Sequence, residues 1–222
     1  QDYRYNFAIS GAKCENMTTG MSRQAQRLVY LMDREPAAWA DGIVTIRIGI
    51  NSIGTHEPLA RFARSGLDRA AQNEVEACAG YVREAVRLIR ANHKTTRIVL
   101  IGILNNSDFI PWVSHWKTPR ELTHIAAVMD AYDDALKKTA DADANIAFWD
   151  DRAWFARYFG DRAEDGSPRY HGTRLTGPTP IDYTQGDAPT NAILADNHAG
   201  TVWNCLWARD LLNMLKQLFG YR

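Results

Sequence analysis

Short apolar runs alternate along the chain with longer segments in which apolar residues recur at helical spacing. The runs at residues 43–50 and 97–104 are rich in β-branched side chains and predict buried strands. Shorter runs at residues 5–10 and 145–149 predict two further strands. Strands that alternate with helices form a parallel sheet covered on both faces, so the pattern predicts an α/β fold.

The helical spacing covers four segments. In residues 20–34 the apolar side chains that share one face are Met21, Ala25, Leu28, Leu31 and Met32. The same kind of spacing predicts helices at residues 67–92, 120–139 and 200–219. Neither a repeat nor a low-complexity linker separates these segments, so we expect residues 1–222 to form a single domain.

Residues 160–189 depart from this alternation. Nine Gly and Pro residues are spaced irregularly over this segment, which predicts a long loop. Long ordered loops in compact domains are often functional, so we expect substrate contacts here. The polar side chains available for them include His171, Asp182 and Asp187.

Composition and charge narrow the class of protein. The chain has 222 residues, of which 45% are hydrophobic and 23% are charged, and this is enough chain for a hydrophobic core. Lys and Arg together number 26, as do Asp and Glu, so the formal net charge is zero and nucleic acid is not expected as the main partner. No apolar run reaches the ~18 residues of a membrane span.

The cysteines and histidines do not form a recognisable metal-binding pattern. Cys14, Cys78 and Cys205 contain no Cys-x-x-Cys spacing, and the six histidines are scattered. We therefore expect no metal and no organic cofactor. A bridge between Cys78 and Cys205 is compatible with the sequence, and so are three buried free thiols. Among compartments, the sequence gives a slight preference to a secreted or periplasmic protein.

Three positions at the predicted strand and helix ends carry groups suited to acyl transfer. Gly11 follows the first predicted strand, Asn51 follows the second, and His198 precedes the last helix. Ligands of parallel sheets gather at the carboxyl ends of the strands. A Gly amide can approach a substrate closely, and an Asn amide can donate to a developing oxyanion. His198, with Asp196 two residues before it, can act as a general base.

The segments around these residues resemble the conserved blocks of the SGNH (GDSL-like) hydrolase family. Residues 6–12 read NFAISGA, residues 46–52 read IRIGINS, and residues 196–200 read DNHAG. The resemblance extends in order over essentially the whole chain. It implies a three-layer α/β/α sandwich with a parallel sheet in flavodoxin-like strand order.

The resemblance also implies a role for each matching residue. Gly11 and Asn51 would form the oxyanion hole, His198 would be the general base, and Asp196 would orient it. Two positions depart from the family pattern. Ser52 stands where the family usually has Asp, and the acid lies two residues before the His instead of three.

The Gly-Asp-Ser block that holds the family's nucleophile does not occur in these 222 residues. In the family, this block follows a central strand that lies between the strands corresponding to residues 5–10 and 43–50. Without that strand both neighbours would lose hydrogen-bond partners, and a buried unpaired backbone group costs about 1–3 kcal/mol. We therefore expect an associated N-terminal fragment of the same protein to supply the strand and the Ser. A strand from another chain is the alternative.

Other residues near these blocks are predicted to contact the substrate. Ser10 lies next to Gly11, and Cys14 lies on the same loop, where it could react or simply fill space. Trp112 and Trp116 follow the third predicted strand and could stack on a sugar or an acyl group, or pack within their loop.

These features predict a serine-type ester hydrolase that acts on a small-molecule or carbohydrate ester. Three alternatives remain open. The chain could be a non-catalytic SGNH-like module that binds a ligand or a carbohydrate, or an O-acyltransferase on the same scaffold. It could also be an unrelated flavodoxin-like binding domain, in which Asp196 and His198 are merely surface residues.

Overall fold

The computed structural model describes residues 4–174 and 180–220. The chain divides into two compact units. The first comprises Gln1–Leu104 and Thr123–Asp150, and the second comprises Asn105–Leu122 and Asp151–Arg222. Compact units of this kind can belong to one domain, so the single domain stays a prediction.

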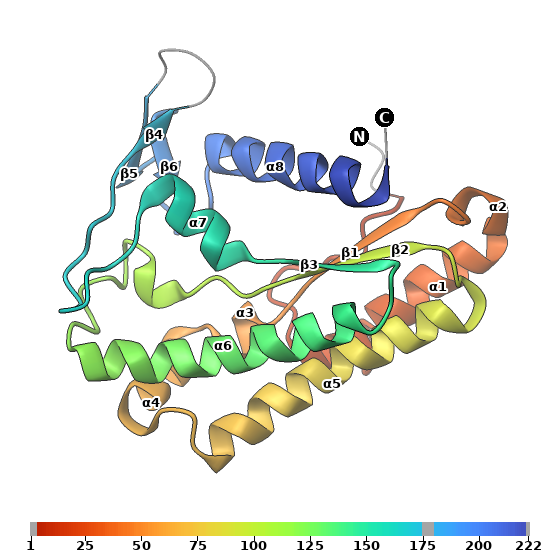
Figure 1. The fold of residues 1–222 in the computed structure, drawn as a ribbon, viewed down its shortest axis with the longest axis horizontal. Coiled ribbons are helices and arrows are strands. Elements are labelled where there is room, and N and C mark those ends of the chain that lie inside the picture. The colour runs from red at the N-terminus through yellow and green to blue at the C-terminus, as the bar shows by residue number, and fades with distance from the viewer. Residues whose placement is uncertain (1–3, 175–179, 221–222) are drawn as a thin grey trace. The chain divides into compact units, whose positions relative to one another are not determined.

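A three-stranded parallel sheet forms the centre of the first unit (Figure 1). Its strands are β1 (Ile43–Arg47), β2 (Arg97–Ile101) and β3 (Ile146–Trp149), in the order β1-β2-β3. Ile43 pairs with Arg97 and Ile98 pairs with Ile146, and both pairings are parallel. The last four residues of β2 are all buried, as expected of a strand with a neighbour on each side. The parallel sheet predicted from the sequence is thus confirmed.

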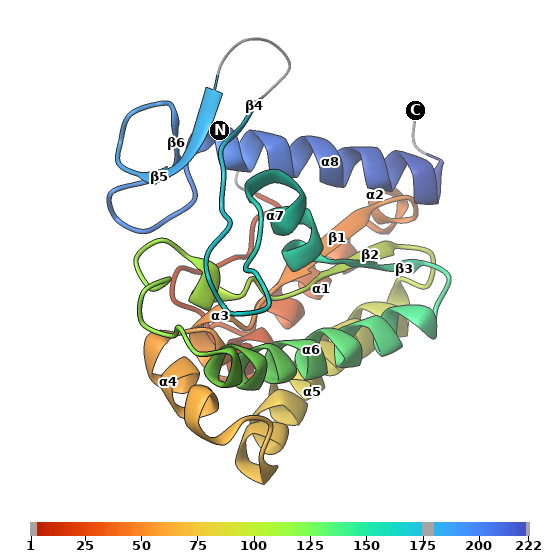
Figure 2. The same ribbon diagram turned by 60° about the vertical axis from the view of Figure 1, so that its left-hand side comes forward.

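The long helices of the first unit lie along one side of this sheet (Figures 1 and 2). They are α1 (Gln24–Arg34), α5 (Arg69–Asn92) and α6 (Pro119–Asp141), which continues into the second unit at its first turn. The N-cap of α5 is Asp68, whose side chain accepts a hydrogen bond from the Ala71 amide. All three helices were predicted to within a few residues. A second helical layer is not part of this unit, so the three-layer sandwich stays a prediction.

Short helices complete the first unit. These are α2 (Pro36–Trp39), α3 (Ile50–Ile53) and α4 (His56–Ser65), together with the 3₁₀ turn η1 (Cys14–Met17). The sequence pattern did not predict α4. The predicted strand at residues 43–50 is three residues too long, because Ile50 already begins α3.

The predicted strand at residues 5–10 is wrong. Residues 6–9 are irregular and are followed by a turn. A strand exists only when a neighbour satisfies its backbone groups, and among the described residues no strand pairs with this segment. The apolar run therefore has the residue types of a strand, but it lacks the hydrogen-bonding partner among the described residues that a strand needs.

The second unit is built from short strands and two helices. It contains η2 (Asn106–Asp108), α7 (Asp151–Phe159), β4 (Thr173–Arg174), β5 (Pro180–Gln185), β6 (Asn191–Ile193) and α8 (Thr201–Phe219). Its sheet has the order β4-β5-β6, with β4–β5 antiparallel and β5–β6 parallel. The long loop predicted at residues 160–189 is therefore partly wrong, because β4 and β5 lie within it. The predicted C-terminal helix is confirmed.

Aromatic side chains fill the core of the second unit. Phe159 stacks on Trp203 with ring centroids 4.9 Å apart, and Phe155 contacts both rings. Beside them, Tyr183 packs on Phe155 and Phe159. The pattern analysis missed α7 because these rings give it only a short and weakly amphipathic face.

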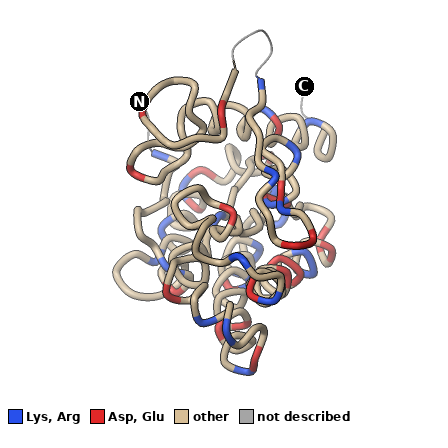
Figure 3. Tube along the Cα trace, turned by 90° about the vertical axis from the view of Figure 1, so that its left-hand side faces the viewer, with Lys and Arg blue, Asp and Glu red and all other residues tan. Residues whose placement is uncertain are grey.

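Acidic and basic residues are intermixed along the chain (Figure 3). This distribution agrees with the equal counts of the two kinds of charge. No helix in residues 4–174 and 180–220 has the length and apolarity needed to cross a membrane. The same residues contain no group of three or more His, Cys, Asp or Glu arranged to hold a metal ion.

Candidate active site

Gly11 lies in a tight turn of the first unit. The Ala12 amide donates to the Ile9 carbonyl at 3.1 Å, and Gly11, at the third position of the turn, has φ +74°. This position of a type II turn requires a positive φ, which explains why a Gly is found there. A Cβ at Gly11 would meet no atom within 4 Å, so the backbone at this point borders open space.

Asn51 lies on α3, immediately after the turn that ends β1. Gly49 makes this turn with φ +122°, and a Cβ there would lie only 3.2 Å from the Tyr132 ring. The hydroxyl of Tyr132 donates to the Ile48 carbonyl at 3.0 Å. Burial raises the pKa of Tyr132, so the phenol keeps the proton that it donates. The close approach of Tyr132 therefore fixes the turn that positions Asn51.

The structure brings the Gly11 turn and the Asn51 turn together through two hydrogen bonds. Asn51 Nδ2 donates to the Ala12 carbonyl at 3.2 Å, and the Cys14 amide donates to Ser52 Oγ at 2.9 Å. An Asn side chain has two N–H donors on Nδ2. One of them orients Asn51 against the Gly11 turn, which leaves the second available to a ligand.

A disulfide anchors the same loop to the core. Cys14 is bonded to Cys78 of α5, with a Cα–Cα distance of 5.1 Å, and Cys205 is a free, exposed cysteine. This result corrects both expectations about the cysteines, the bridge between Cys78 and Cys205 and the three buried thiols. It also corrects the prediction that Cys14 contacts the substrate as a reactive thiol, because its sulfur is bonded to Cys78 and only 3% of the residue is exposed.

Asp196 and His198 form a pair in the second unit, on the turn between β6 and α8. Asp196 Oδ1 lies 3.1 Å from His198 Nδ1 and accepts the His198 amide at 3.1 Å. These hydrogen bonds, the one from the amide first, lower the pKa of Asp196. With Nδ1 facing the carboxylate, Nε2 is the ring nitrogen left to exchange a proton with a substrate or nucleophile.

This turn is held by hydrogen bonds from the neighbouring strand. Asn197 has a left-handed conformation with φ +71°, and its Oδ1 accepts from Gln185 Nε2 at 2.6 Å. The Leu194 amide donates to the His198 carbonyl at 2.7 Å, and the Ala195 amide donates to Asp187 Oδ1 at 3.0 Å. The side chains of His198 and Asp196 nevertheless remain 79% and 67% exposed.

The sequence-predicted site residues thus fall into two pairs. Gly11 and Asn51 are brought together in the first unit, and Asp196 and His198 are brought together in the second. Each pair lies within one unit, and the joint action of the two pairs in catalysis stays a prediction.

The remaining predicted contacts have different environments. Ser10 is exposed in the turn beside Gly11, and Trp112 is partly exposed. Trp116 is 4% exposed, so packing is the role that the structure shows for its ring. Contact with substrate at Ser10 and Trp112 stays a prediction.

Sequence reasoning missed a polar network centred on Asp108 in the second unit. Asp108 Oδ1 accepts from Arg162 Nε at 3.0 Å and from the Tyr170 hydroxyl at 2.7 Å, while the Asp108 carbonyl accepts from the Tyr183 hydroxyl at 2.5 Å. Burial, and then the Asp108 charge, raise the pKa of both tyrosines. These residues are 54 to 75 positions apart from Asp108, so no local spacing could have revealed the network.

Comparison with known proteins gives one match. The family model described as GDSL-like Lipase/Acylhydrolase family matches residues 1–175, which include Gly11 and Asn51 and end before Asp196 and His198. Neither the curated proteins nor the solved structures contain a significant match.

Proposed function

Because the chain belongs to the GDSL-like lipase/acylhydrolase family, we propose that it is a serine-type hydrolase of carboxylic esters. Membership supports hydrolysis of ester bonds as the general class of activity and removes the unrelated flavodoxin-like domain as an alternative. The observation that carries the serine mechanism is the contact between Asp196 and His198, because a carboxylate on Nδ1 is what a catalytic imidazole needs.

In the proposed first step, a serine Oγ attacks the carbonyl carbon of the ester, and its proton passes to His198 Nε2. The carboxylate of Asp196 holds the ring and stabilises the imidazolium that forms. Collapse of the tetrahedral intermediate breaks the bond to the alcohol, whose oxygen takes the proton from His198. Water then attacks the acyl-enzyme by the same sequence and releases the acid and the free serine.

Gly11 and Asn51 stabilise the negative charge that develops on the carbonyl oxygen. Gly11 contributes its backbone N–H at a turn whose surroundings are open. Asn51 contributes the N–H that is not bonded to the Ala12 carbonyl. Donors that are fixed before the reaction begins need no reorganisation in the transition state, and each is worth about 10²–10³-fold in kcat.

The nucleophile belongs, in this proposal, to an associated N-terminal fragment of the same protein. Its basis is that these 222 residues contain no Gly-Asp-Ser. The substrate is a small-molecule ester or an O-acyl group on a carbohydrate. A non-catalytic module that binds such an ester without cleaving it is the second candidate, and the probe experiment below distinguishes the two. An O-acyltransferase differs only in using an alcohol in place of water as the acceptor.

A fluorophosphonate probe tests the proposal. The native protein is treated with the probe, and the intact mass of every polypeptide present is measured. We expect one adduct on a short fragment carrying Gly-Asp-Ser, and none on a His198→Ala variant in the same time. An adduct on this chain would move the nucleophile into these 222 residues. If no adduct forms and an ester still binds, the non-catalytic module replaces the hydrolase.

A further inference from the structure

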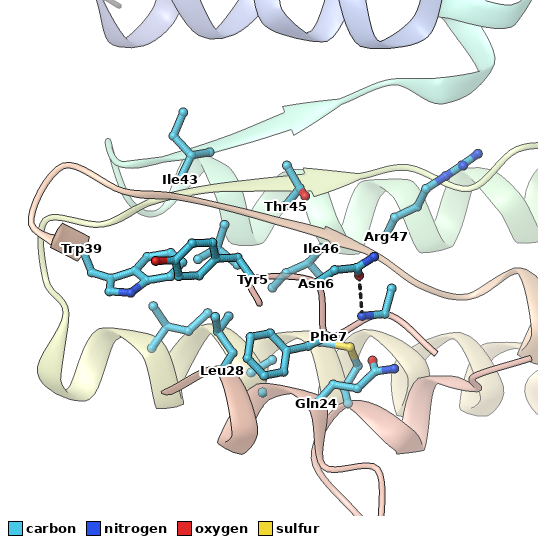
Figure 4. Close-up of a pocket in the computed structure, with 16 residues that line it drawn as sticks. Tyr5, Asn6, Phe7, Gln24, Leu28, Trp39, Ile43, Thr45, Ile46 and Arg47 are labelled. Carbon is cyan, nitrogen blue, oxygen red and sulfur yellow. Dashed lines mark hydrogen bonds between the residues drawn. The ribbon is translucent and has the colours of Figure 1, made fainter. Parts of the chain in front are cut away.

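The helix α1 has one side in the core of the first unit and the other side in solvent. Its inner side carries the buried residues Gln24 and Leu28, which line a cavity of about 280 Å³ beside β1 (Figure 4). Its outer side carries four exposed residues at the spacing of one helix face, from the N-cap to the last residue. These residues, which we call the α1 stripe, are Arg23, Arg27, Tyr30 and Arg34.

The arginines of the α1 stripe are held without being neutralised. The guanidinium carbon of Arg27 lies 5.8 Å from the centroid of the Phe7 ring, and that of Arg34 lies 5.7 Å from the centroid of the Tyr30 ring. Within residues 4–174 and 180–220, none of the three arginines takes part in an ion pair. Contact with an aromatic ring positions a guanidinium group but leaves its charge available to a partner.

A pocket of about 550 Å³ on the same face adds apolar groups to this charge. Its lining contains no Asp or Glu, and it consists of Arg4, Phe7, Met21, Arg23, Gln26, Arg27, Tyr30 and Leu31. Arg4 is paired with Glu35. Met21 is 98% exposed and Tyr30 is 67% exposed, the two largest exposed fractions among the large hydrophobic residues that the structure describes. The face therefore offers cationic and apolar groups together.

This combination distinguishes between classes of partner. A polyanion such as a nucleic acid would neutralise the arginines but would leave Met21 in water. A neutral bilayer would bury Met21 but would provide no net negative charge for the guanidinium groups. An anionic lipid surface meets both requirements, because lipid phosphates pair with arginines and the boundary between headgroups and acyl chains accepts an apolar side chain.

We propose that the α1 stripe and Met21 dock the protein on the surface of an anionic lipid bilayer. The helix α1 lies in the plane of the interface, with its arginines at the level of the lipid phosphates. Met21 enters the boundary with the acyl chains, and Tyr30 lies among the headgroups. Such binding is peripheral and reversible, because charge provides most of it. The inference is independent of the proposed function, since none of the candidate catalytic residues takes part.

A second copy of this chain is a weaker partner for this face. In a dimer with two-fold symmetry the same surface patch is used by both subunits. The α1 stripe of one copy would then meet the arginines of the other, and no acidic residue lines the pocket between them. Like charges that face each other oppose such a contact.

Binding to lipid vesicles tests the α1 stripe. The protein is sedimented with vesicles of equal parts phosphatidylglycerol and phosphatidylcholine, and separately with vesicles of phosphatidylcholine alone. We expect saturable binding to the anionic vesicles that weakens as salt is added, and little binding to the neutral ones. The triple variant with Arg23→Gln, Arg27→Gln and Arg34→Gln should bind at least about tenfold more weakly. Gln and Arg have similar helix propensities, so α1 should remain folded.

A charge-matched control separates the α1 stripe from the net charge of the protein. Arg64, Arg69 and Lys94 are exposed residues of the same unit that do not line the pocket. Replacement of all three by Gln removes as much positive charge as the first triple variant. We expect this control to bind anionic vesicles within about twofold of the unaltered protein. Circular dichroism and the urea midpoint show whether both triple variants are folded.

A fluorophore at position 21 tests insertion of the side chain. Met21→Cys is made together with Cys205→Ser, which removes the free thiol, and is labelled with nitrobenzoxadiazole. The emission of this dye rises and shifts to the blue in apolar surroundings. We expect this change with anionic vesicles, and no change from a label at Ala91→Cys, an exposed position of α5.

The other outcomes overturn the proposal. Equal vesicle binding by the two triple variants would remove the α1 stripe from the interface, and no saturable binding would remove the lipid as partner. A label at position 21 that stays in water on bound vesicles would contradict the docking geometry. Heparin binding that the stripe variant loses, without vesicle binding, would assign the face to a polyanion. A dimer in sedimentation velocity that Met21→Ser abolishes would assign it to a second copy.

Discussion

The two pairs of predicted site residues are held in very different ways. Gly11 and Asn51 lie on turns that are tied to each other by hydrogen bonds and to α5 by the disulfide of Cys14. Asp196 and His198 lie on an exposed turn that is held by side chains of β5 and the loop after it. The first pair is fixed by the core of its unit, and the second is fixed only locally.

The difference corresponds to the task proposed for each pair. An oxyanion hole works through donors whose positions do not change during the reaction, so rigidity is its main requirement. A general base must exchange protons with the substrate and with water, which an exposed imidazole can do. Substitutions in the first pair should therefore affect both stability and chemistry, whereas those in the second should affect chemistry alone.

The sharpest test of this contrast is His198→Ala. We expect hydrolysis of p-nitrophenyl acetate to fall by about 10⁴-fold or more, because the serine loses its base. The side chain is largely exposed, so the free energy of unfolding should change by less than about 0.5 kcal/mol. The measurements are kcat/KM and urea denaturation on the same preparation. Activity within a few-fold of wild type would remove His198 from the mechanism.

Loss of the disulfide should have the next largest effect, on stability. The bridge joins residues 64 positions apart. In the chain-entropy account, a disulfide stabilises the fold by restricting the unfolded chain. For a closed loop of this size, the double variant with Cys14→Ser and Cys78→Ser should lower the free energy of unfolding by about 4 kcal/mol. Cys205→Ser is the matched control and should leave stability nearly unchanged, since this cysteine is free and exposed. Equal urea midpoints for the two variants would contradict the anchoring role.

Asn51→Ala tests the chemical contribution of the rigid pair. Loss of one oxyanion donor should lower kcat by about 10²–10³-fold and leave KM nearly unchanged. Steady-state kinetics with p-nitrophenyl acetate provide the measurement, and the thermal midpoint shows how much of the change is structural. A rise in KM at constant kcat would instead indicate that Asn51 contributes to ground-state binding.

The smallest effect concerns the titration of Asp196. Its folded pKa is lowered by the His198 amide and then by the imidazole, so the carboxylate should titrate below its ordinary value of 3.8. The direction of the pH dependence follows from linkage. Ionised Asp196 contributes to folding stability above pH 3.8, and this contribution is lost as the pH falls through the lower folded pKa. Carboxyl ¹³C NMR should show this midpoint moving upward, but only partway, in His198→Ala. No movement would mean that the ring contributes nothing.

The sequence predicted the regular parts of the first unit well. The strands β1, β2 and β3 follow from buried β-branched or apolar runs, and α5 and α6 follow from helical spacing, because burial in a sheet or on a helix face leaves a local pattern. It also predicted that Gly11 and Asn51 would lie together, because both were expected at the carboxyl ends of parallel strands. The two turns are joined by the hydrogen bond from Asn51 to the Ala12 carbonyl, although only β1 is a strand.

The features that the sequence did not predict depend on residues that are far apart in the chain. Residues 5–10 have the composition of a strand but no described strand beside them. Three cysteines allow three single bridges, and no local signal selects Cys14–Cys78. Gln24 Nε2 and Trp39 Nε1 are buried without a hydrogen-bond partner, and this depends on the packing around them, which leaves no local signal in the sequence.

The free thiol of Cys205 has a consequence for how the protein must be handled and how it matures. A thiolate attacks an existing disulfide, so Cys205 can exchange with the bridge between Cys14 and Cys78 in any state that opens the fold. Two of the three possible bridged isomers are non-native. Oxidative refolding at alkaline pH should therefore yield a mixture of isomers, whereas Cys205→Ser should refold to a single species.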